Sequence, residues 1–580
     1  MWLKYNVKYA RNFFALRKRR DMRFDSTQVF SALEALIWGR VLLSVVNMRV
    51  RGCGVTFPMV SRGWLLALGV MVSAWSAPAW AVDCAPPLGA DQALASKSGK
   101  LADPNTVTHV YQQLGNHCLW SAEQIESLTK ALTKSVDDGL DPSEFHVADI
   151  RRLGKTATPE ALRDRDILLT DAVIRYAKVM QSGEVDTSAI EQDTEFPTRP
   201  TFPADSLILA LTQSHEALSD AVVGPKAPEY SGLKEALARY RRIHASGGWK
   251  VFPDGPNLRP GDASAVLPAL NERLKATGDL ADFSEARVYA GETVEAVRRF
   301  QARHGLAADG IVGPKTREAL NVPVESRIRT IQLNLERWRD LGYAIPPTRF
   351  EVNVPAASAH LIVGNQSVLD MKAVVGDPKH PTPMLASKIT DVILNPYWTV
   401  PPSIIENEIN PILKRDPGYL ERNNMHWQDG NLVQDPGGTN PLGKLRFTFA
   451  NKFGVYVHDT SAPGLFANYD RARSHGCLRL EKPVDLAAAL LANDPDWPPE
   501  KIEQTIAGGK TVRIPLTAPM PVVIAYWTAF TDPDGTVEFR NDVYGRDERL
   551  AAALKAIREK GGDAPHLDTD VYFAEGCGPS

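Results

Sequence analysis

Residues 455–479 read VYVHDTSAPGLFANYDRARSHGCLR. The stretch opens as an apolar, β-branched strand that ends on His458, and it closes on Ser-His-Gly-Cys at residues 474–477. A thiol is a weak nucleophile at its reference pKa of about 8.5, and a neighbouring imidazole takes its proton or stabilises the thiolate. Gly476 lets the backbone turn sharply, so that N–H groups point at a developing oxyanion. The pattern therefore predicts acyl transfer through a thioester on Cys477.

Each residue of this pattern also has a plainer interpretation. Cys477 alone fits an inert buried cysteine, and His458 alone fits a hydrogen-bonded histidine at a strand end. A metal site is a third alternative, but the region lacks a third and a fourth ligand at a recognisable spacing. The local arrangement of thiol, imidazole and glycine favours nucleophilic catalysis, and no cofactor is expected.

Short segments rich in β-branched residues surround this stretch, and Gly, Pro and Asn bound them as they bound strands. These segments lie at 350–354, 360–363, 372–375, 391–394, 447–449 and 455–457. They predict a mostly β domain. A polar, partly helical insertion interrupts it at 403–436, and so long an excursion within a sheet is either a lid or a disordered loop.

The sequence from about 100 to 250 has helical periodicity and no catalytic pattern, so a helical scaffold is expected. Apolar faces recur at 122–136, 168–179 and 233–243. Residues 259–322 form a compact unit of three helices, with a tight turn at Asp309-Gly310 and Pro314 in the first turn of the third helix.

The N-terminal region differs in charge from the rest of the chain. Residues 1–81 hold 12 Lys or Arg and 3 Asp or Glu, which leaves −12 on the remainder although the whole chain carries −3. A basic extension at 1–58, which a misassigned start codon would also explain, precedes an expected secretory signal peptide at 59–81. The near-balanced total argues against a nucleic-acid binder. Cys84 and Cys118 are candidates for a disulfide in an oxidising envelope.

The stretch from Tyr456 to Arg479 resembles the L,D-transpeptidase catalytic domain of the YkuD type, whose signature is a His, a gap and then Ser/Thr-His-Gly-Cys. The unit at 259–322 resembles the type 1 peptidoglycan-binding domain. The order of the parts resembles the large periplasmic branch of the family. Further similarity lies at 374–376, 382–383, 395–401, 435–437, 442–444, 526–528 and 544–547.

The resemblance implies a multidomain α+β protein with a helical scaffold, a three-helix peptidoglycan-binding bundle and a mostly β catalytic domain. The expected boundaries are 82–258 for the scaffold, 259–322 for the bundle, 323–550 for the catalytic domain with its capping insertion at 403–436, and 551–580 for a C-terminal helix and tail.

The resemblance also implies roles for the motif residues. Cys477 would be the nucleophile, and His458 the general base, oriented by a backbone carbonyl such as that of Asp459. The amides of His475, Gly476 and Cys477 would form the oxyanion hole.

Four other residues receive less specific roles. Ser474 would orient the loop. Arg479 would hold a substrate carboxylate or brace the loop, because its planar fork suits carboxylates; a structural salt bridge is the alternative. Tyr456 and Trp398 would line the substrate groove, although Trp398 also fits a core position.

The implied activity is the formation of 3→3 cross-links between meso-diaminopimelate residues, with release of D-Ala from tetrapeptide stems. The expected partners are donor and acceptor stem peptides of peptidoglycan and other wall-synthesis enzymes, without nucleic acid, and the expected location is the periplasm. Hydrolysis by an L,D-carboxypeptidase, attachment of a protein to peptidoglycan and exchange of the terminal D-amino acid stay open. A catalytically inactive wall-binding scaffold is the alternative from another class.

Overall fold

The computed structural model describes residues 95–560 except 116, 157, 214–216, 223 and 282–286. The expected basic extension, the signal peptide and Cys84 lie outside the described residues, as does the tail from residue 561. In the described part of the chain, no helix is long and apolar enough to cross a membrane.

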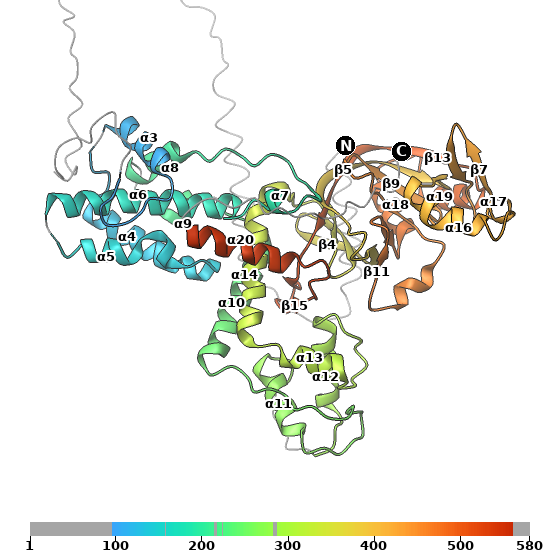
Figure 1. The fold of residues 1–580 in the computed structure, drawn as a ribbon, viewed down its shortest axis with the longest axis horizontal. Helices are drawn as coiled ribbons and strands as arrows, with labels where there is room; N and C mark the ends of the chain where they lie inside the picture. The colour runs from blue at the N-terminus through green and yellow to red at the C-terminus, as the bar shows by residue number, and fades with distance from the viewer. Residues whose placement is uncertain are drawn as a thin grey trace, which may run out of the picture. The chain divides into compact units, whose positions relative to one another are not determined.

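The first part of the described chain is helical, as expected (Figure 1). The long helix α6 (Pro159–Ser182) buries most of its apolar side chains against the shorter helices around it. Thr158 caps its N-terminus, and Pro159 occupies the first turn, where a missing N–H costs nothing. The other elements are α3 (Pro104–Leu114), α4 (Ala122–Thr133), η1 (Lys134–Asp138), η2 (Pro142–Phe145), α5 (Val147–Leu153), α7 (Thr187–Ile190), α8 (Ala204–Gln213), α9 (Leu218–Ala221) and α10 (Pro228–Ala245).

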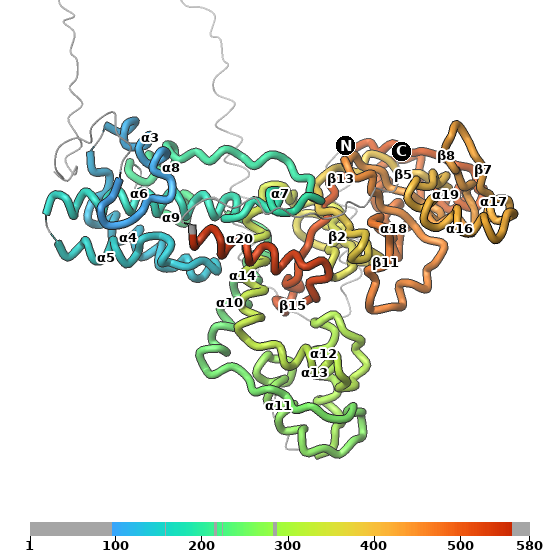
Figure 2. Tube along the Cα trace, viewed as in Figure 1, coloured from blue at the N-terminus to red at the C-terminus, as the bar shows by residue number. Residues whose placement is uncertain are grey.

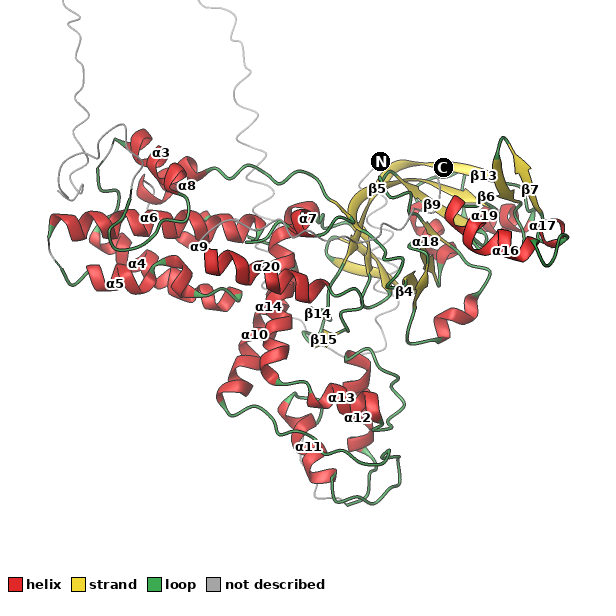
Figure 3. Cartoon of the chain, viewed as in Figure 1, coloured by secondary structure: helices red, strands yellow, loops and turns green. Residues whose placement is uncertain are grey.

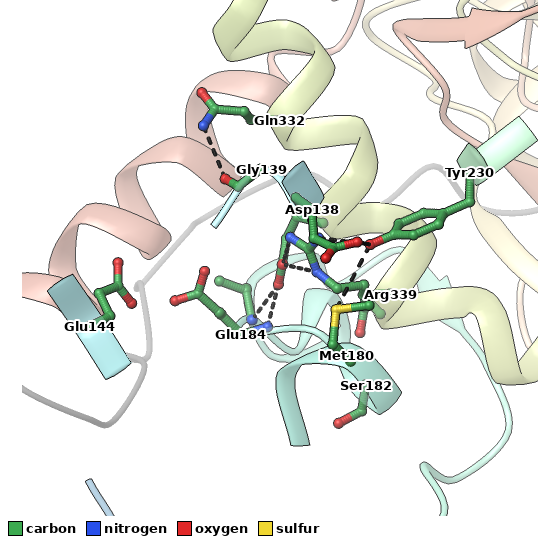
Figure 4. Close-up of polar contacts among 12 residues, drawn as sticks. Asp138, Gly139, Glu144, Met180, Ser182, Glu184, Tyr230, Gln332 and Arg339 are labelled. Carbon is green, nitrogen blue, oxygen red and sulfur yellow. Dashed lines mark hydrogen bonds and ion pairs between the residues drawn. The ribbon is translucent and has the colours of Figure 1, made fainter. Parts of the chain in front are cut away.

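The helix α14 (Val324–Leu341) lies within the range expected for the catalytic domain, yet it packs its apolar face into this helical core. Its Arg339 is buried and donates to the backbone carbonyl of Asp138 at 2.7 Å and to the Glu336 carboxylate at 2.8 Å. Glu336 also accepts from the backbone N–H of Val185 at 2.9 Å. Figure 4 shows Arg339 between Asp138, Tyr230 and Glu184. Because a buried charge needs a partner, this network fixes how α14 seats against the helices.

Three helices form the expected bundle around their own core: α11 (Leu267–Ala276), α12 (Glu292–Arg303) and α13 (Pro314–Asn321). Gln301 closes the turn at Asp309-Gly310: its amide donates to Asp309 at 2.9 Å and accepts from the Gly310 N–H at 2.8 Å. Gly310 has φ +74, a conformation that suits glycine.

The last part of the chain is rich in strands, as expected, and Figure 3 shows nearly all strands gathered there. The sheet runs β1-β5-β13-β2-β3-β4-β12-β10-β9, and β9 also pairs with β5, which closes the sheet on itself. The strands are β1 (Thr194–Glu195), β2 (Arg349–Asn353), β3 (Ser358–Val363), β4 (Gln366–Gly376), β5 (Met384–Leu394), β9 (Leu445–Phe449), β10 (Val457–His458), β11 (Ala472–Ser474), β12 (Leu478–Leu480) and β13 (Val512–Ala525).

The insertion at 403–436, called the cap below, forms helices and strands, so of the two alternatives the structure favours the lid. It holds α15 (Pro402–Ile404), the π-helical turn η4 (Ile405–Ile409), α16 (Asn410–Leu413) and α17 (Tyr419–Arg422). The strands β7 (Met425–Gln428) and β8 (Asn431–Gln434) join β6 (Trp398–Thr399) in a small sheet. A separate core formed by Val400, Ile409, Met425 and Leu432 holds the cap together.

The C-terminal segment returns to both parts of the fold, as the tube in Figure 2 traces. The helix α20 (Arg546–Lys560) begins five residues before the expected C-terminal segment, and Arg337 on α14 pairs with its Asp547 at 2.5 Å. The remaining elements are η3 (Gly342–Ala344), η5 (Pro463–Ala467), α18 (Pro483–Leu490), α19 (Pro499–Ala507), β14 (Ala529–Thr531) and β15 (Val537–Phe539).

Candidate active site

Two adjacent parallel strands bring the expected nucleophile and base together. Val457 and His458 of β10 pair in register with Leu478 and Arg479 of β12, and Cys477 immediately precedes Leu478. Val457 and Leu478 are fully buried in the core of the β domain. Since side chains alternate along a strand, His458 and Arg479 share the opposite face of the sheet.

Cys477 is buried and is disulfide-bonded in the structure. A sulfur in a disulfide carries no free thiol, so the expected nucleophilic role of Cys477 would require its reduction. Cys118 is disulfide-bonded as well. Since Cys84 lies outside the described residues, the pairing of Cys84 with Cys118 stays a prediction.

Ser474 holds the loop of residues 474–477, called the nucleophile loop below. Its hydroxyl donates to the carbonyl of Cys477 at 2.6 Å and accepts from the N–H of Gly476 at 3.2 Å. Gly476 has φ +107, so the turn favours glycine. The geometry is consistent with an orienting role for Ser474. The Ser474 hydroxyl also accepts the hydrogen bond of the Gly476 amide, which was expected to donate to an oxyanion.

A second loop, residues 376–382, is hydrogen-bonded to the nucleophile loop. Thr382 is fully buried; its hydroxyl donates to the carbonyl of Gly476 at 2.9 Å and accepts from the N–H of Gly376 at 2.8 Å. Tyr544 donates to the carbonyl of Gly376 at 2.6 Å and accepts from the N–H of Thr382 at 3.2 Å. A Cβ on Gly376 would lie 2.1 Å from the carbonyl oxygen of His380, so only glycine fits there.

These supporting residues carry no role in the sequence-based prediction. Thr382 and Tyr544 lie in segments that resemble the family, and that similarity was the available signal. Their function depends on contacts between residues 94 and 168 positions apart, which local patterns do not reveal.

His458 is buried, and its Nδ1 makes no hydrogen bond with any described residue. Burial lowers the pKa of His458 to about 3, and the nearby positive charge of Arg479 acts in the same direction. The backbone of Asp459 opposes the shift. The imidazole is therefore neutral at pH 7, the form in which a general base accepts a proton.

The carboxylate of Asp459 is engaged by the backbone of a neighbouring segment rather than by the His458 imidazole. It accepts from the backbone N–H of Lys444 at 2.7 Å, next to Gly443, whose φ is +61. This contact ties the end of β10 to the segment before β9. Burial raises the pKa of Asp459.

Arg479 makes no ion pair with a carboxylate within the described residues, so the alternative of a structural salt bridge has no partner there. Burial lowers the pKa of its guanidinium. Arg446 on β9, which the sequence-based prediction did not include, pairs in register with His458 from the other side.

Trp398 and Tyr456 connect His458 to the cap. Trp398 donates a hydrogen bond to the Tyr456 hydroxyl, and it packs against both the β-domain core and the core of the cap. The Tyr456 ring lies 5.6 Å from the His458 ring, edge to face. Burial raises the pKa of Tyr456 to about 12. Trp398 thus packs against two cores and contacts Tyr456, which lies beside His458.

His475 contacts the cap directly. Its Nε2 lies 3.1 Å from a carboxylate oxygen of Glu408, and its ring lies 4.5 Å from that of His380. The nucleophile loop and the cap are therefore joined by one half-exposed pair. Among the described residues, no group of three or more His, Cys, Asp or Glu side chains is arranged to hold a metal ion.

Comparison with known proteins identifies the parts. Residues 347–514 match the family model of the L,D-transpeptidase catalytic domain, residues 105–237 match a scaffold domain, and residues 267–320 match a "Putative peptidoglycan binding domain". The expected family assignment is thereby confirmed for these three segments.

Two curated proteins are similar over part of their length. A "Putative L,D-transpeptidase" of Haemophilus influenzae is 30% identical over 223 residues, which are 35% of this chain and 45% of that protein. The N-acetylmuramoyl-L-alanine amidase CwlL of Bacillus licheniformis is 40% identical over 67 residues, 11% of this chain and 19% of that protein. The chain thus spans less than half the length of these relatives.

Two solved structures with some similarity to this chain are of proteins named L,D-transpeptidases. The enzyme of Xylanimonas cellulosilytica is 18% identical with a TM-score of 0.16, covering 47% of this chain and 100% of that chain. A cysteine-to-serine mutant of the Enterococcus faecium L,D-transpeptidase is 12% identical with a TM-score of 0.16, covering 31% of this chain and 50% of that chain.

Proposed function

We propose that the protein is a peptidoglycan L,D-transpeptidase that forms 3→3 cross-links. Its residues 347–514 match the L,D-transpeptidase catalytic domain. The observation that carries the proposal is the pairing of β10 with β12, which sets a neutral, buried His458 beside the strand that begins after Cys477. The match of residues 267–320 to a peptidoglycan-binding domain supports the same substrate.

The proposed first half-reaction is acylation. Cys477, once reduced, gives its proton to His458 and attacks the carbonyl at the L-centre of meso-diaminopimelate in a donor tetrapeptide. A C–S bond forms, the peptide C–N bond breaks, and His458 returns the proton to the leaving amine of D-Ala. Since the Gly476 amide is engaged by Ser474, we assign the oxyanion to the amides of His475 and Cys477.

The proposed second half-reaction is transfer to an acceptor. The side-chain amine of diaminopimelate in a second stem attacks the thioester, and the Cys477 thiol leaves. Water as acceptor gives a carboxypeptidase; a free D-amino acid gives exchange of the terminal residue; a protein amine gives attachment. The cap, joined to the nucleophile loop by Glu408 and His475, would restrict water and favour the stem.

The proposed setting follows from the substrate. A chain with peptidoglycan-related domains works in the cell envelope, and we propose the periplasm, with donor and acceptor stems as partners. Because the residues beyond 81 carry a net charge of −12, binding to the wall cannot rest on an overall positive charge and must depend on local surfaces.

The test is formation of an acyl-enzyme with a carbapenem, followed by intact mass. The protein is reduced with a dithiol and incubated with the carbapenem, and the modified peptide is located by proteolysis. Wild type should gain one adduct on the peptide that contains Cys477, His458→Gln should gain it at least about 100-fold more slowly, and Cys477→Ala should gain none while keeping its circular dichroism. An adduct that persists in Cys477→Ala would contradict the proposal.

A further inference from the structure

Two arginines flank His458 in one row across three strands. Arg446 on β9 and Arg479 on β12 are each the register partner of His458 on β10. The neighbouring row, Phe447, Val457 and Leu478, is fully buried in the β-domain core. Because side chains alternate along strands, the three basic side chains share the face that bears the candidate site.

Neither guanidinium has an anionic partner among the residues that the structure describes. In the described part of the chain, no carboxylate lies within 4.0 Å of Arg446 or Arg479, and the Nε of each is buried without a hydrogen bond. Nearby arginines are engaged: Arg471 donates to several backbone carbonyls, and Arg473 pairs with Asp470 at 3.7 Å. The two arginines beside His458 are therefore partly buried, and neither has an anionic partner among the described residues.

The position of Arg446 is fixed by packing. Its guanidinium lies 4.4 Å from the centre of the Tyr456 ring, and the Tyr456 hydroxyl is itself bonded to Trp398. Stacking on an aromatic face leaves the edge of a guanidinium available for a planar anion. Holding a partly buried cation without an anionic partner costs free energy, which a ligand of opposite charge would offset.

We infer that Arg446 and Arg479 form a carboxylate subsite on both sides of His458, which binds a carboxylate of the donor stem peptide. The inference rests on the proposed function, because it names how the substrate of that site is recognised. A donor tetrapeptide offers two such groups: the free carboxyl of diaminopimelate and the terminal carboxyl of D-Ala.

The subsite would also couple binding to catalysis. Both arginines disfavour a positive charge on His458, in addition to its burial. A carboxylate bound between them offsets that charge, so His458 accepts the Cys477 proton more readily when the donor is in place. The reacting groups are then activated by the substrate that they attack.

The experiment measures binding and turnover of three tetrapeptides: one with both carboxyls free, one amidated on diaminopimelate and one amidated on D-Ala. Binding is measured by calorimetry in a Cys477→Ala background, and acylation by release of D-Ala or its amide from otherwise wild-type protein. Each is repeated with Arg446→Gln, Arg446→Lys, Arg479→Gln and the control Arg473→Gln.

One of the two amidations should weaken binding to the wild-type pocket by about 10- to 100-fold, the range for a lost charge-assisted hydrogen bond. Arg446→Gln and Arg479→Gln should weaken binding of the peptide with free carboxyls by the same factor as that amidation, and should remove the preference for the free peptide over the amidated one. Arg446→Lys should keep part of this preference. Arg473→Gln should leave all values within about twofold. The amidation that matters identifies the carboxylate.

Three results would overturn the subsite: unchanged binding in Arg446→Gln and Arg479→Gln, an equal loss for all three peptides, or indifference of the wild-type pocket to both amidations. An equal loss would assign the arginines a structural role. Failure of the proposed function would give a different result: the reduced wild-type protein would bind the tetrapeptide but release no D-Ala.

Discussion

Replacement of Thr382 by Val tests whether the loop at 376–382 positions the nucleophile. The two side chains have similar shape, so the change removes the hydroxyl and little else. Thr382 is fully buried and serves two backbone groups, the carbonyl of Gly476 at 2.9 Å and the N–H of Gly376 at 2.8 Å. Each buried group left without a partner costs about 1–3 kcal/mol, so we expect the two groups together to lower the free energy of unfolding by about 2–6 kcal/mol.

The same substitution should slow acylation. The Gly476 carbonyl adjoins Cys477, and a displacement of about 1 Å at a reacting group costs on the order of 100-fold in rate. Since a domain has about 5–15 kcal/mol of stability, the variant should still fold at 25 °C. Thr382→Ser keeps the hydroxyl and is the matched control.

The assay combines urea unfolding with the rate of carbapenem acylation of the reduced protein at saturating inhibitor. Thr382→Val should show a lower unfolding midpoint and acylation slower by about 10- to 100-fold, and Thr382→Ser should recover most of both. A Val variant that loses stability but acylates at the wild-type rate would refute positioning by Thr382. An unchanged midpoint would show that the two hydrogen bonds of the Thr382 hydroxyl do not stabilise the fold.

Three further predictions concern charged groups. Arg339→Met should cost about 3–5 kcal/mol in unfolding free energy, measured by urea denaturation, because it leaves Glu336 buried without its cation; wild-type stability would contradict the network. The pKa of His458 is lowered to about 3 in the folded protein, so the unfolded chain binds a proton at this residue first as the pH falls. The free energy of unfolding should therefore be unaffected by His458 above pH 6.5 and should decrease between pH 6.5 and pH 3 by up to about 1.4 kcal/mol per pH unit. Thermal unfolding of His458→Gln should lack this dependence on pH. Glu408→Gln should change stability by less than about 1 kcal/mol, because the pair with His475 is half-exposed, but it should raise hydrogen exchange in the cap; unchanged exchange would show that the contact does not hold the cap.

The sequence was informative where the chemistry is local. His458 and the nucleophile loop were found because a strand end, a glycine turn and a thiol lie in one short stretch, and β-branched runs marked most strands of the sheet. The helical region, the three-helix bundle and the insertion were also found from periodicity and turn residues.

What the sequence did not reveal depends on pairing between distant segments. Arg446 faces His458 only because β9 pairs with β10, and Tyr544 reaches Gly376 from 168 residues away. α14 was grouped with the strands by position, but its apolar face fits the helical core, and its buried Arg339 finds partners there. Register and long-range ion pairing are tertiary properties, which local patterns do not specify.

Muropeptide analysis of tetrapeptide-rich sacculi, after incubation with the reduced protein, tests directly whether the protein forms 3→3 cross-links. Wild-type protein should generate new tripeptide–tetrapeptide dimers joined through two diaminopimelate residues, together with free D-Ala, and Cys477→Ala should generate neither. Unchanged muropeptides with wild-type protein that still forms a carbapenem adduct would contradict cross-linking as the activity. Tripeptides without dimers would show that water, rather than a second stem, is the acceptor.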